Sequence, residues 1–287
     1  MPIVEAVGII SKPNSDAAGR IVPELIQWFA ARGIAVRMDL ETAHYAGSKA
    51  GLARELVPDG CDLIVVLGGD GTLLSAARAI GRREIPLFPV NLGGLGFLTA
   101  ISVEELYPEL GRFFGGEHRI ARRKLLTTEV ERAGVIVEKH DALNDAVITK
   151  AAIARMIDLD TFVDGQLMCN YKADGLIVST PTGSTAYSLS AGGPIIYPTV
   201  PAICITPICP HMLTNRPVIV AETSIIRIVT HGDGDSIVLT IDGQVGTPLY
   251  EGDIVVCHSS SYSLLLVRPP RMMFFDVLRE KLKWGER

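Results

Sequence analysis

Gly68-Gly69-Asp70-Gly71-Thr72 is the stretch that decides how the first part of this chain folds. It follows the apolar, β-branched run 62–67 and precedes the helix-favouring run 73–80, so it predicts a strand, a glycine turn and a helix. Glycines let backbone N–H groups approach an anion, and a helix N-terminus adds partial positive charge. The turn therefore predicts a phosphate-binding loop. Its carboxylate, Asp70, is suited to hold a metal, a ribose hydroxyl or the proton of a nucleophile.

The residues around this turn predict a parallel α/β unit. Strands are expected at 6–10, 34–38 and 63–67, with a helix that Asp16 caps between the first two and a short helix at 52–56. A further strand at 86–90 runs into a second glycine-rich loop, 91–99, and a helix is expected over 103–114. Because ligands bind beyond the carboxyl ends of such strands, the two glycine loops are expected to face each other across one crevice.

The pattern changes near Arg119 to short alternating strands separated by turns such as Asp164-Gly165. Two of the later strands are expected separately, at 254–257 and 263–267, before a helix at 274–284. The predicted fold class is an α/β N-terminal domain with a parallel sheet plus a β-rich C-terminal domain, with the last helix returning to the N-terminal domain. The predicted boundaries are 1–118 for the α/β domain, 119–269 for the β-rich domain and 270–287 for the C-terminal helix.

Composition excludes several classes of protein. With 287 residues, 48% of them hydrophobic, and a net charge of −5, the chain is a globular protein without a broad nucleic-acid-binding face. Its five cysteines form no Cys-x-x-Cys pair, which predicts buried free thiols and a cytoplasmic location. Residues 175–215 contain no Asp, Glu, Lys or Arg, but their six prolines argue against a membrane helix and favour core strands and a pocket wall.

Several nucleotide-binding and catalytic motifs are absent from the sequence. There is no P-loop, no protein-kinase catalytic loop and no Gly-x-Ser-x-Gly elbow, and the dinucleotide fingerprint fails at Leu74 and again at Thr99. A lone Gly-Gly-Asp-Gly is also compatible with a simple tight turn. The accompanying segments must therefore decide between these interpretations.

Three segments supply that context. Asn144-Asp145 stands at the start of an expected strand, Asp174-Gly175 precedes a buried one, and the run 180–194 is dense in glycines and small hydroxyls. Hydroxyls and backbone amides without charge suit ribose hydroxyls and a base edge, and Tyr187 adds a ring. The alternative for this run is a serine-rich turn with a helix cap.

Together these residues resemble the NAD kinase family (ATP-NAD kinases) of the bacterial type, in family order and over almost the whole chain. The segments that match the family are Gly68–Thr72, Asn91–Leu98, Asn144-Asp145, Asp174-Gly175, Thr182–Gly193, Pro207–His211, Arg216-Pro217 and Asp242–Gln244. Many members have Asn-Glu where this chain has Asn144-Asp145, so the carboxylate is one methylene shorter here. Diacylglycerol-type lipid kinases share only the first motif.

The resemblance implies transfer of the terminal phosphoryl group of ATP to the 2′-hydroxyl of the adenosine ribose of NAD, forming NADP. Asp70 would be catalytic, and a divalent cation, Mg²⁺, would bridge phosphate oxygens, with unknown protein ligands. Gly68, Gly69, Gly71 and Thr72 would bind the ATP phosphates. The implied NAD-binding residues are Asp70, Gly71, Phe97, Asn144, Asp145, Lys172, Asp174, Thr182, Thr185, Ala186, Tyr187, Ser190 and Gln244.

Other expectations accompany this assignment. A homodimer or homotetramer is expected, with NAD and ATP as partners and neither nucleic acid nor a membrane. The run Arg122-Arg123-Lys124 is interpreted as a solvated charge run rather than a phosphate site. Two alternatives remain: a lipid kinase that shares the first motif, and a nucleotide-sensing module without catalysis.

Overall fold

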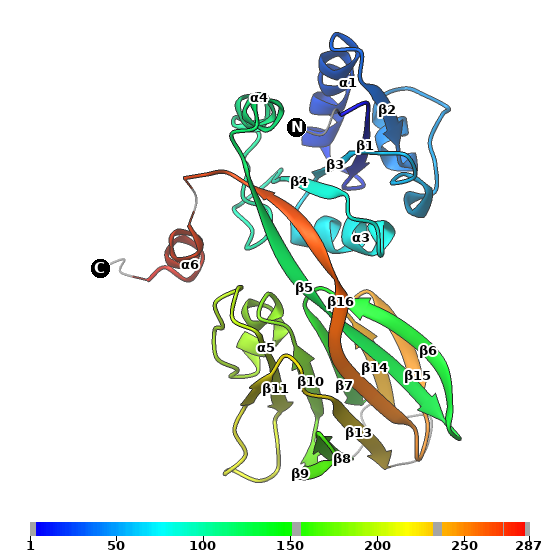
Figure 1. Ribbon diagram of the computed structural model, residues 1–287, viewed down its shortest axis with the longest axis vertical. Coiled ribbons are helices and arrows are strands. Elements are labelled where there is room, and N and C mark those ends of the chain that lie inside the picture. The colour runs from blue at the N-terminus through cyan, green and yellow to red at the C-terminus, as the bar shows by residue number, and fades with distance from the viewer. Residues whose placement is uncertain (1–3, 151–155, 232–236, 272, 285–287) are drawn as a thin grey trace. The chain divides into compact units, whose positions relative to one another are not determined.

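The computed structural model describes residues 4–150, 156–231, 237–271 and 273–284. The chain divides into two compact units, of which the first comprises Met1–Arg122 with Leu264–Arg287 and the second Arg123–Ser263. The chain passes between the units within two long paired strands, β5 (Arg119–Arg132) and β16 (Ile254–Arg268) (Figure 1). The predicted fold class is confirmed, because the first unit is α/β with parallel strands, the second is β-rich, and the last helix belongs to the first.

The first unit is built on parallel strands in the order β2-β1-β3-β4-β16. Every residue of β3 is buried, as expected for a strand covered on both faces. The strands that begin and end in this unit are β1 (Ala6–Ser11), β2 (Ala35–Met38), β3 (Leu63–Leu67) and β4 (Pro86–Val90).

The helices of the first unit differ from the sequence expectation mainly at their ends. Ser15, not Asp16, is the N-cap of α1, because its hydroxyl accepts a hydrogen bond from the Ala18 N–H (3.3 Å). The expected helix at 52–56 is a single 3₁₀ turn, and α2 was not predicted. The helical elements are α1 (Asp16–Ala30), α2 (Leu40–Tyr45), η1 (Arg54–Leu56), α3 (Asp70–Ile80), α4 (Leu106–Gly115) and α6 (Phe274–Leu282).

The second unit contains a six-stranded antiparallel sheet in the order β12-β11-β10-β7-β14-β15. Its other strands run in the order β16-β13-β8-β9, with β5 paired to β16 and β6 to β5. The strands not yet introduced are β6 (Val135–Ala142), β7 (Asp145–Lys150), β8 (Ile157–Val163), β9 (Gln166–Ala173), β10 (Gly175–Ser179), β11 (Ala202–Ile208), β12 (Val218–Ala221), β13 (Ile226–His231), β14 (Ile237–Ile241) and β15 (Val245–Leu249).

The structure corrects the expected strands in two respects. The two strands expected at 254–257 and 263–267 are one continuous strand, β16, because the polar run 258–262 between them keeps its extended backbone in the sheet. The strands β12 and β15 were not predicted. The turn at Asp164-Gly165 is confirmed, since both residues have positive φ (51° and 80°), as a tight hairpin requires.

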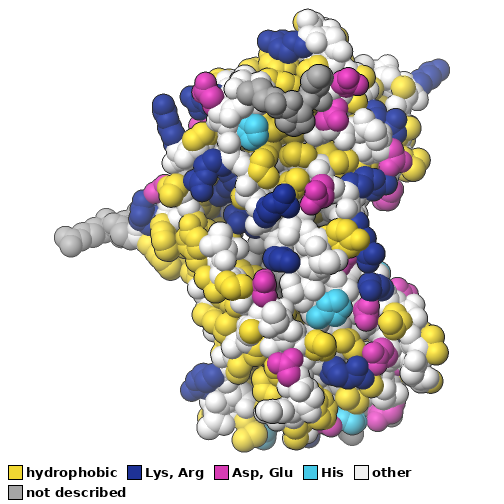
Figure 2. All heavy atoms as spheres, viewed as in Figure 1, with side chains coloured by type: hydrophobic (Ala, Val, Ile, Leu, Met, Phe, Trp, Pro, Cys, Tyr) yellow, Lys and Arg dark blue, Asp and Glu magenta, His cyan; other side chains and the backbone are white. Residues whose placement is uncertain are grey.

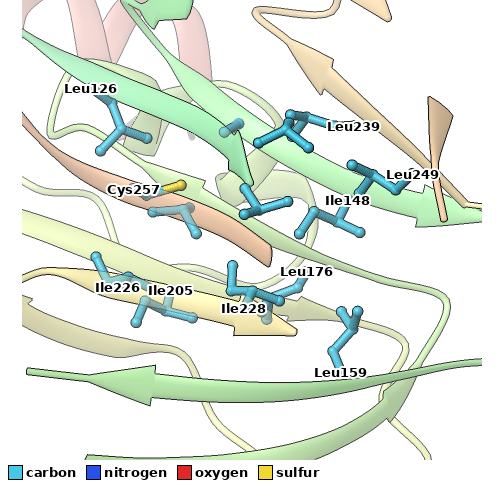
Figure 3. Packing of buried hydrophobic residues seen from close by; sticks show 14 of the residues in the cluster. Leu126, Ile148, Leu159, Leu176, Ile205, Ile226, Ile228, Leu239, Leu249 and Cys257 are labelled. Atoms are coloured by element: carbon cyan, nitrogen blue, oxygen red, sulfur yellow. The ribbon is translucent and has the colours of Figure 1, made fainter. Parts of the chain in front are cut away.

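Aliphatic side chains form the core of the second unit. Figure 3 shows Leu126, Ile148, Leu176, Ile228 and Leu239 packed among the strands, and each is at most 1% exposed. Burying each such side chain contributes about 1.5–3 kcal/mol of transfer free energy. This core gives rigid strand ends for the loops that carry the candidate site.

The uncharged stretch and the cysteines complete the description of the fold. The strands β10 and β11 are buried throughout, which confirms core strands within 175–215. Across the described ranges, no helix combines the length and the apolar character needed to cross a membrane.

The five cysteines differ in burial. Cys61, Cys204 and Cys257 are buried thiols, but Cys169 is half-buried and Cys209 is exposed. The expectation of burial is therefore wrong for those two.

Candidate active site

The predicted glycine turn joins β3 to α3 in the first unit. Gly69 is the N-cap residue of α3, and Asp70 is its first helical residue. A Cβ atom on Gly68 would collide with the Thr72 side chain, so this close approach requires glycine. A Cβ atom on Gly69 or Gly71 would meet nothing within 4 Å. The open space beside Gly69 and Gly71 therefore lets an anionic ligand approach the start of this eleven-residue helix.

The Asp70 carboxylate holds the second glycine-rich loop. Its Oδ2 accepts a hydrogen bond from the N–H of Phe97 (2.9 Å), and its Oδ1 accepts from the N–H groups of Leu98 (3.2 Å) and Thr99 (3.0 Å). The Thr99 hydroxyl donates a fourth hydrogen bond to Oδ1 (3.0 Å). The four donors, together with the position at a helix N-terminus, stabilise the negative charge. The two glycine loops therefore meet at the carboxyl ends of β3 and β4, as predicted.

Asn91 organises the same loop from its first residue. Its Nδ2 donates to Thr99 Oγ1 (2.8 Å) and to the Gly94 carbonyl (2.9 Å). Because the Thr99 hydroxyl accepts from Asn91 and donates to Asp70, the three side chains form a hydrogen-bond relay. A Cβ atom on Gly96 would collide with the Asp70 carboxylate and the Thr99 hydroxyl, so glycine is required beside the relay.

Arg268, the last residue of β16, supports the loop by donating hydrogen bonds to two carbonyl groups of the loop. Its Nη1 donates to the carbonyl oxygens of Phe97 (3.4 Å) and Leu98 (3.3 Å), and the residue is 7% exposed. The same peptide segment therefore donates to the carboxylate of Asp70 and accepts from the guanidinium of Arg268. The half-buried Phe97 ring has the Lys281 ammonium 5.9 Å from its centroid.

In the second unit, a cavity of about 330 Å³ brings together four of the predicted NAD-binding residues. Asn144 and Asp145 reach it from the start of β7, and Ala186 and Tyr187 from the start of α5 (Tyr187–Ser190). The Tyr187 side chain is 44% exposed, so its ring is available for stacking. The other lining residues are Val147, Thr149, Thr240, Asp242 and Gly243. Such a cavity suits a small molecule that presents hydroxyls and a flat ring.

Asp242 fixes the position of Asn144 and Asp145. Its carboxylate accepts hydrogen bonds from the N–H groups of Leu143 (2.9 Å), Asn144 (2.7 Å) and Asp145 (3.2 Å). Asp242 itself adopts a positive φ of 51° in the turn between β14 and β15, which aims its side chain back at the start of β7. The family resemblance includes the segment Asp242–Gln244, but the sequence did not indicate this role of Asp242.

Asp145 is a buried carboxylate beside a second one. The residue is 4% exposed. Its burial, reinforced by the charge of Asp242, raises the pKa of the Asp145 carboxyl to about 7. Near neutral pH the group can therefore either donate a proton to a ligand acceptor or accept a hydrogen bond from a ligand hydroxyl. A buried carboxyl group with a shifted pKa beside a second carboxylate is typical of functional sites.

The hydroxyl-rich segment is packed against Asn144. The Thr180 N–H donates to the Asn144 carbonyl (2.9 Å), and a Cβ atom on Gly183 would collide with the same peptide group. Thr182 is buried, and its carbonyl accepts a hydrogen bond from the Thr185 hydroxyl (3.2 Å). Thr182, Thr185 and Ser190 do not line the cavity, unlike their neighbours Ala186 and Tyr187.

Three other predicted residues also lie outside the cavity lining. Asp174 pairs with Lys150 (2.7 Å), Lys172 is exposed on β9, and Gln244 is exposed in the turn before β15. The residues whose roles the sequence did not indicate are Asn91, Thr99, Asp242 and Arg268, although Asn91 and Asp242 stand in segments that carry the family resemblance. The one available signal was the turn-forming Asp242-Gly243, because an aspartate in a hairpin turn commonly binds backbone N–H groups.

A Thr99→Val substitution tests the relay. It removes the hydroxyl that joins Asn91 to Asp70 at almost constant volume, so we expect it to lower the free energy of unfolding by about 1–3 kcal/mol. The matched control is Thr161→Val, since Thr161 is equally buried (both 0% exposed) but its hydroxyl has no partner among the described residues. Urea unfolding measures both variants. Equal stability changes would contradict the relay.

The raised pKa of Asp145 predicts a pH-dependent stability. The folded protein keeps this proton up to about pH 7, whereas the unfolded chain releases it near 3.8, so stability falls as pH rises between these values. The loss is at most about 1.4 kcal/mol per pH unit. We therefore expect Asp145→Asn to gain stability relative to the wild type as pH rises from 4 to 7. A pH-independent difference between the two unfolding curves would contradict the burial of a carboxyl here.

Two protein-family profiles match the chain. Residues 7–118 match the ATP-NAD kinase N-terminal domain, and residues 143–269 match the ATP-NAD kinase C-terminal domain. The second match covers most of the β-rich unit, which the lipid-kinase alternative, resting on the first motif alone, does not explain.

Relatives and solved structures agree with these matches. The chain is 74% identical to an NAD kinase of Solibacter usitatus, over all of both chains, and 48% identical to one of Geobacter sp. strain M21, over 99% of this chain and 100% of that one. The crystal structure of yeast NADH kinase complexed with NADH is similar over 99% of this chain and 89% of that one, with 27% identity and a TM-score of 0.91. An NAD kinase from Archaeoglobus fulgidus in complex with ATP shares the fold (24% identity, TM-score 0.77, 97% and 98% covered). The chain therefore belongs to the NAD kinase family, and its activity is that of an NAD kinase.

Proposed function

We propose that the two groups of residues described above divide the substrates of this kinase between them. The glycine turn of the first unit binds the phosphates of ATP, and the cavity of the second unit binds the adenosine of NAD, whose 2′-hydroxyl accepts the terminal phosphoryl group. The observation that carries this proposal is the Asp70 carboxylate, fixed at the start of α3 by four hydrogen bonds. The domain roles follow, with 1–118 and the helix within 270–287 serving ATP and 119–269 serving NAD.

The donor site consists of Gly68, Gly69, Gly71 and Thr72. The N–H groups of the turn and the partial charge of the helix N-terminus attract phosphate oxygens, and the Thr72 hydroxyl adds a donor. Phosphoryl transfer depends mainly on positioning and on neutralising charge, and a rigid turn supplies both. The side-chain-free positions Gly69 and Gly71 let the phosphates reach the backbone.

Asp70 is the catalytic residue of the proposal. Among the described residues, only the Phe97 N–H donates to its Oδ2, which retains capacity for the 2′-hydroxyl of the ribose. From there the carboxylate orients the hydroxyl oxygen toward the phosphorus. It takes up the hydroxyl proton as the new P–O bond forms and the bond between the terminal phosphorus and the bridging oxygen breaks, which releases ADP. The network of Asn91, Thr99 and Arg268 keeps the carboxylate in place during this step.

On the acceptor side, Asn144 and Asp145 contact the adenosine of NAD, and Tyr187 stacks on a ring. Ala186 borders the same cavity. We assign the remaining predicted contacts to other parts of the dinucleotide: Asp70, Gly71, Phe97, Lys172, Asp174, Thr182, Thr185, Ser190 and Gln244.

A divalent cation, magnesium, completes the proposed donor site. When bound, it would neutralise the charge that develops on the phosphate oxygens. The described residues contain no group of three or more His, Cys, Asp or Glu side chains able to hold a metal on their own. This agrees with the usual binding of Mg²⁺ by one or two carboxylates plus substrate phosphates, and Asp70 is the acidic residue of the turn.

The remaining expectations belong to the same proposal. A homodimer or homotetramer is supported by the edge strand β12, where Ile219 is 51% exposed, and by Leu213, which is 89% exposed. Absence of nucleic-acid binding is supported by the interspersed basic and acidic side chains on the face drawn in Figure 2. A cytoplasmic location and the absence of a membrane partner remain proposals that rest on the sequence.

The direct test is NADP formation from ATP, Mg²⁺ and NAD, followed in the wild type and in Asp70→Asn. An asparagine amide places an N–H₂ group against a backbone donor in either orientation, so we expect turnover to fall by about 10²–10⁴-fold, with some loss of stability. The affinity of the second unit for NAD should be largely retained. Asp59→Asn, in an exposed ion pair, is the control. Turnover within twofold of the wild type would exclude Asp70 as the catalytic group, and NAD binding without turnover in the wild type would favour the sensing module.

Tyr187→Ala tests the acceptor cavity. Removing the ring takes away stacking, so we expect the Kd for NAD to rise about tenfold while the KM for ATP is unchanged. Tyr250→Ala provides a control, because Tyr250 is similarly exposed (42%) but lies outside the cavity lining. Equal effects of the two variants on NAD titrations would contradict the stacking role.

A further inference from the structure

Arg123 on β5 is a buried cation without a partner among the residues that the structure describes. It is 9% exposed, and its Nε is enclosed without a hydrogen-bond partner. No hydrogen bond or ion pair joins its guanidinium to any residue that the structure describes. Its neighbours differ: Arg122 is exposed and lies 3.5 Å from Glu84, and Lys124 donates to the Ser260 carbonyl (3.3 Å). The interpretation of Arg122-Arg123-Lys124 as a solvated charge run is therefore wrong for Arg123.

Burying an unpaired guanidinium is energetically costly. A charged group removed from water loses several kcal/mol of solvation unless an opposite charge and hydrogen bonds replace it. The burial lowers the pKa of the Arg123 side chain from its usual value, and no carboxylate offsets this effect. Five N–H donors in a planar fork match a carboxylate or a phosphate. An anionic ligand would compensate for this cost.

The surroundings of Arg123 indicate which ligand. The group close enough to act on its charge is Tyr197. The preceding residue, Ile196, is bonded through both its N–H (2.9 Å) and its carbonyl (3.3 Å) to the hydroxyl of Ser184. Ser184 lies in the hydroxyl-rich segment that leads into Ala186 and Tyr187 of the cavity. Arg123 is thus linked by a short chain of contacts to the proposed NAD-binding segment.

We propose that Arg123 donates hydrogen bonds to a phosphate group of the dinucleotide bound by the second unit. This inference rests on the proposed NAD site and extends it. Two phosphates share the required chemistry: the diphosphate present in both NAD and NADP, and the 2′-phosphate present in NADP alone. Arginine commonly recognises either kind of group.

Arg123→Met removes the charge at similar side-chain length in the full-length protein. We expect the Kd for the dinucleotide to rise about 10- to 100-fold, as for loss of a charge-assisted contact. Arg123→Lys should recover part of the affinity, and Arg122→Met is the matched control. The free protein should keep or gain thermal stability in Arg123→Met, because an unpaired buried charge disappears. Arg123→Gln replaces the methionine variant if that one does not fold.

Calorimetric titrations with NAD, NADP and ATP separate the outcomes. Weakening of both NAD and NADP assigns Arg123 to the diphosphate, and weakening of NADP alone assigns it to the 2′-phosphate. Unchanged binding of both dinucleotides, or weakening of ATP alone, would overturn the inference, as would lowered stability of the free variants with normal dinucleotide affinity. These titrations do not depend on turnover, so failure of the wild type to form NADP is a separate result that concerns the proposed function.

Discussion

The hydrogen bonds between the Asp70 carboxylate and the loop at Phe97–Thr99 are the interaction on which the first unit's site depends. The carboxylate lies at the start of α3, and the loop follows β4, so the contact ties together two strand ends that are adjacent in the sheet. Without this shared carboxylate, the N–H groups of three successive residues would lack a hydrogen-bond acceptor. Asp70 is therefore a structural anion before any substrate arrives, and its orientation is set by the backbone.

The second unit uses the same device. Asp242 accepts hydrogen bonds from the N–H groups of Leu143, Asn144 and Asp145, as Asp70 does from Phe97, Leu98 and Thr99. In each unit, an aspartate next to a glycine gathers three consecutive backbone donors and so orders a polar segment at the end of a strand. Backbone amides are held more rigidly than side chains, and a site ordered in this way needs little rearrangement to bind a ligand. Both clusters of backbone donors lie beside residues to which we assign a substrate contact.

The sequence predicted the strand, turn and helix around Asp70 because apolar runs bounded by glycine are local signals. The sequence-based prediction failed where a long-range contact determines the local structure. The polar residues 258–262 of β16 interrupt the apolar pattern, yet the strand continues because its backbone pairs with other strands. The roles of Asp242 and Arg268 depend on segments about 100 and 170 residues away, which no local pattern contains. Asp174 was singled out from its motif, and its contact with NAD stays a prediction; the structure adds its ion pair with Lys150 (2.7 Å), which the sequence did not indicate.

Arg123 shows why a charge run alone misleads, and Asp145 shares its unusual environment. Both are buried in the second unit, and neither has an opposite charge among the described residues to offset its desolvation. Asp253 is also buried, but it pairs with the more exposed Arg132 (2.7 Å), whereas a buried charge without such a partner costs stability. A chain retains such groups where binding a ligand restores the missing interactions, because function then offsets the loss of stability. A structural charge and a ligand-binding charge therefore differ in whether the protein itself supplies an opposite charge or a hydrogen-bond partner. Only the folded structure reveals this difference.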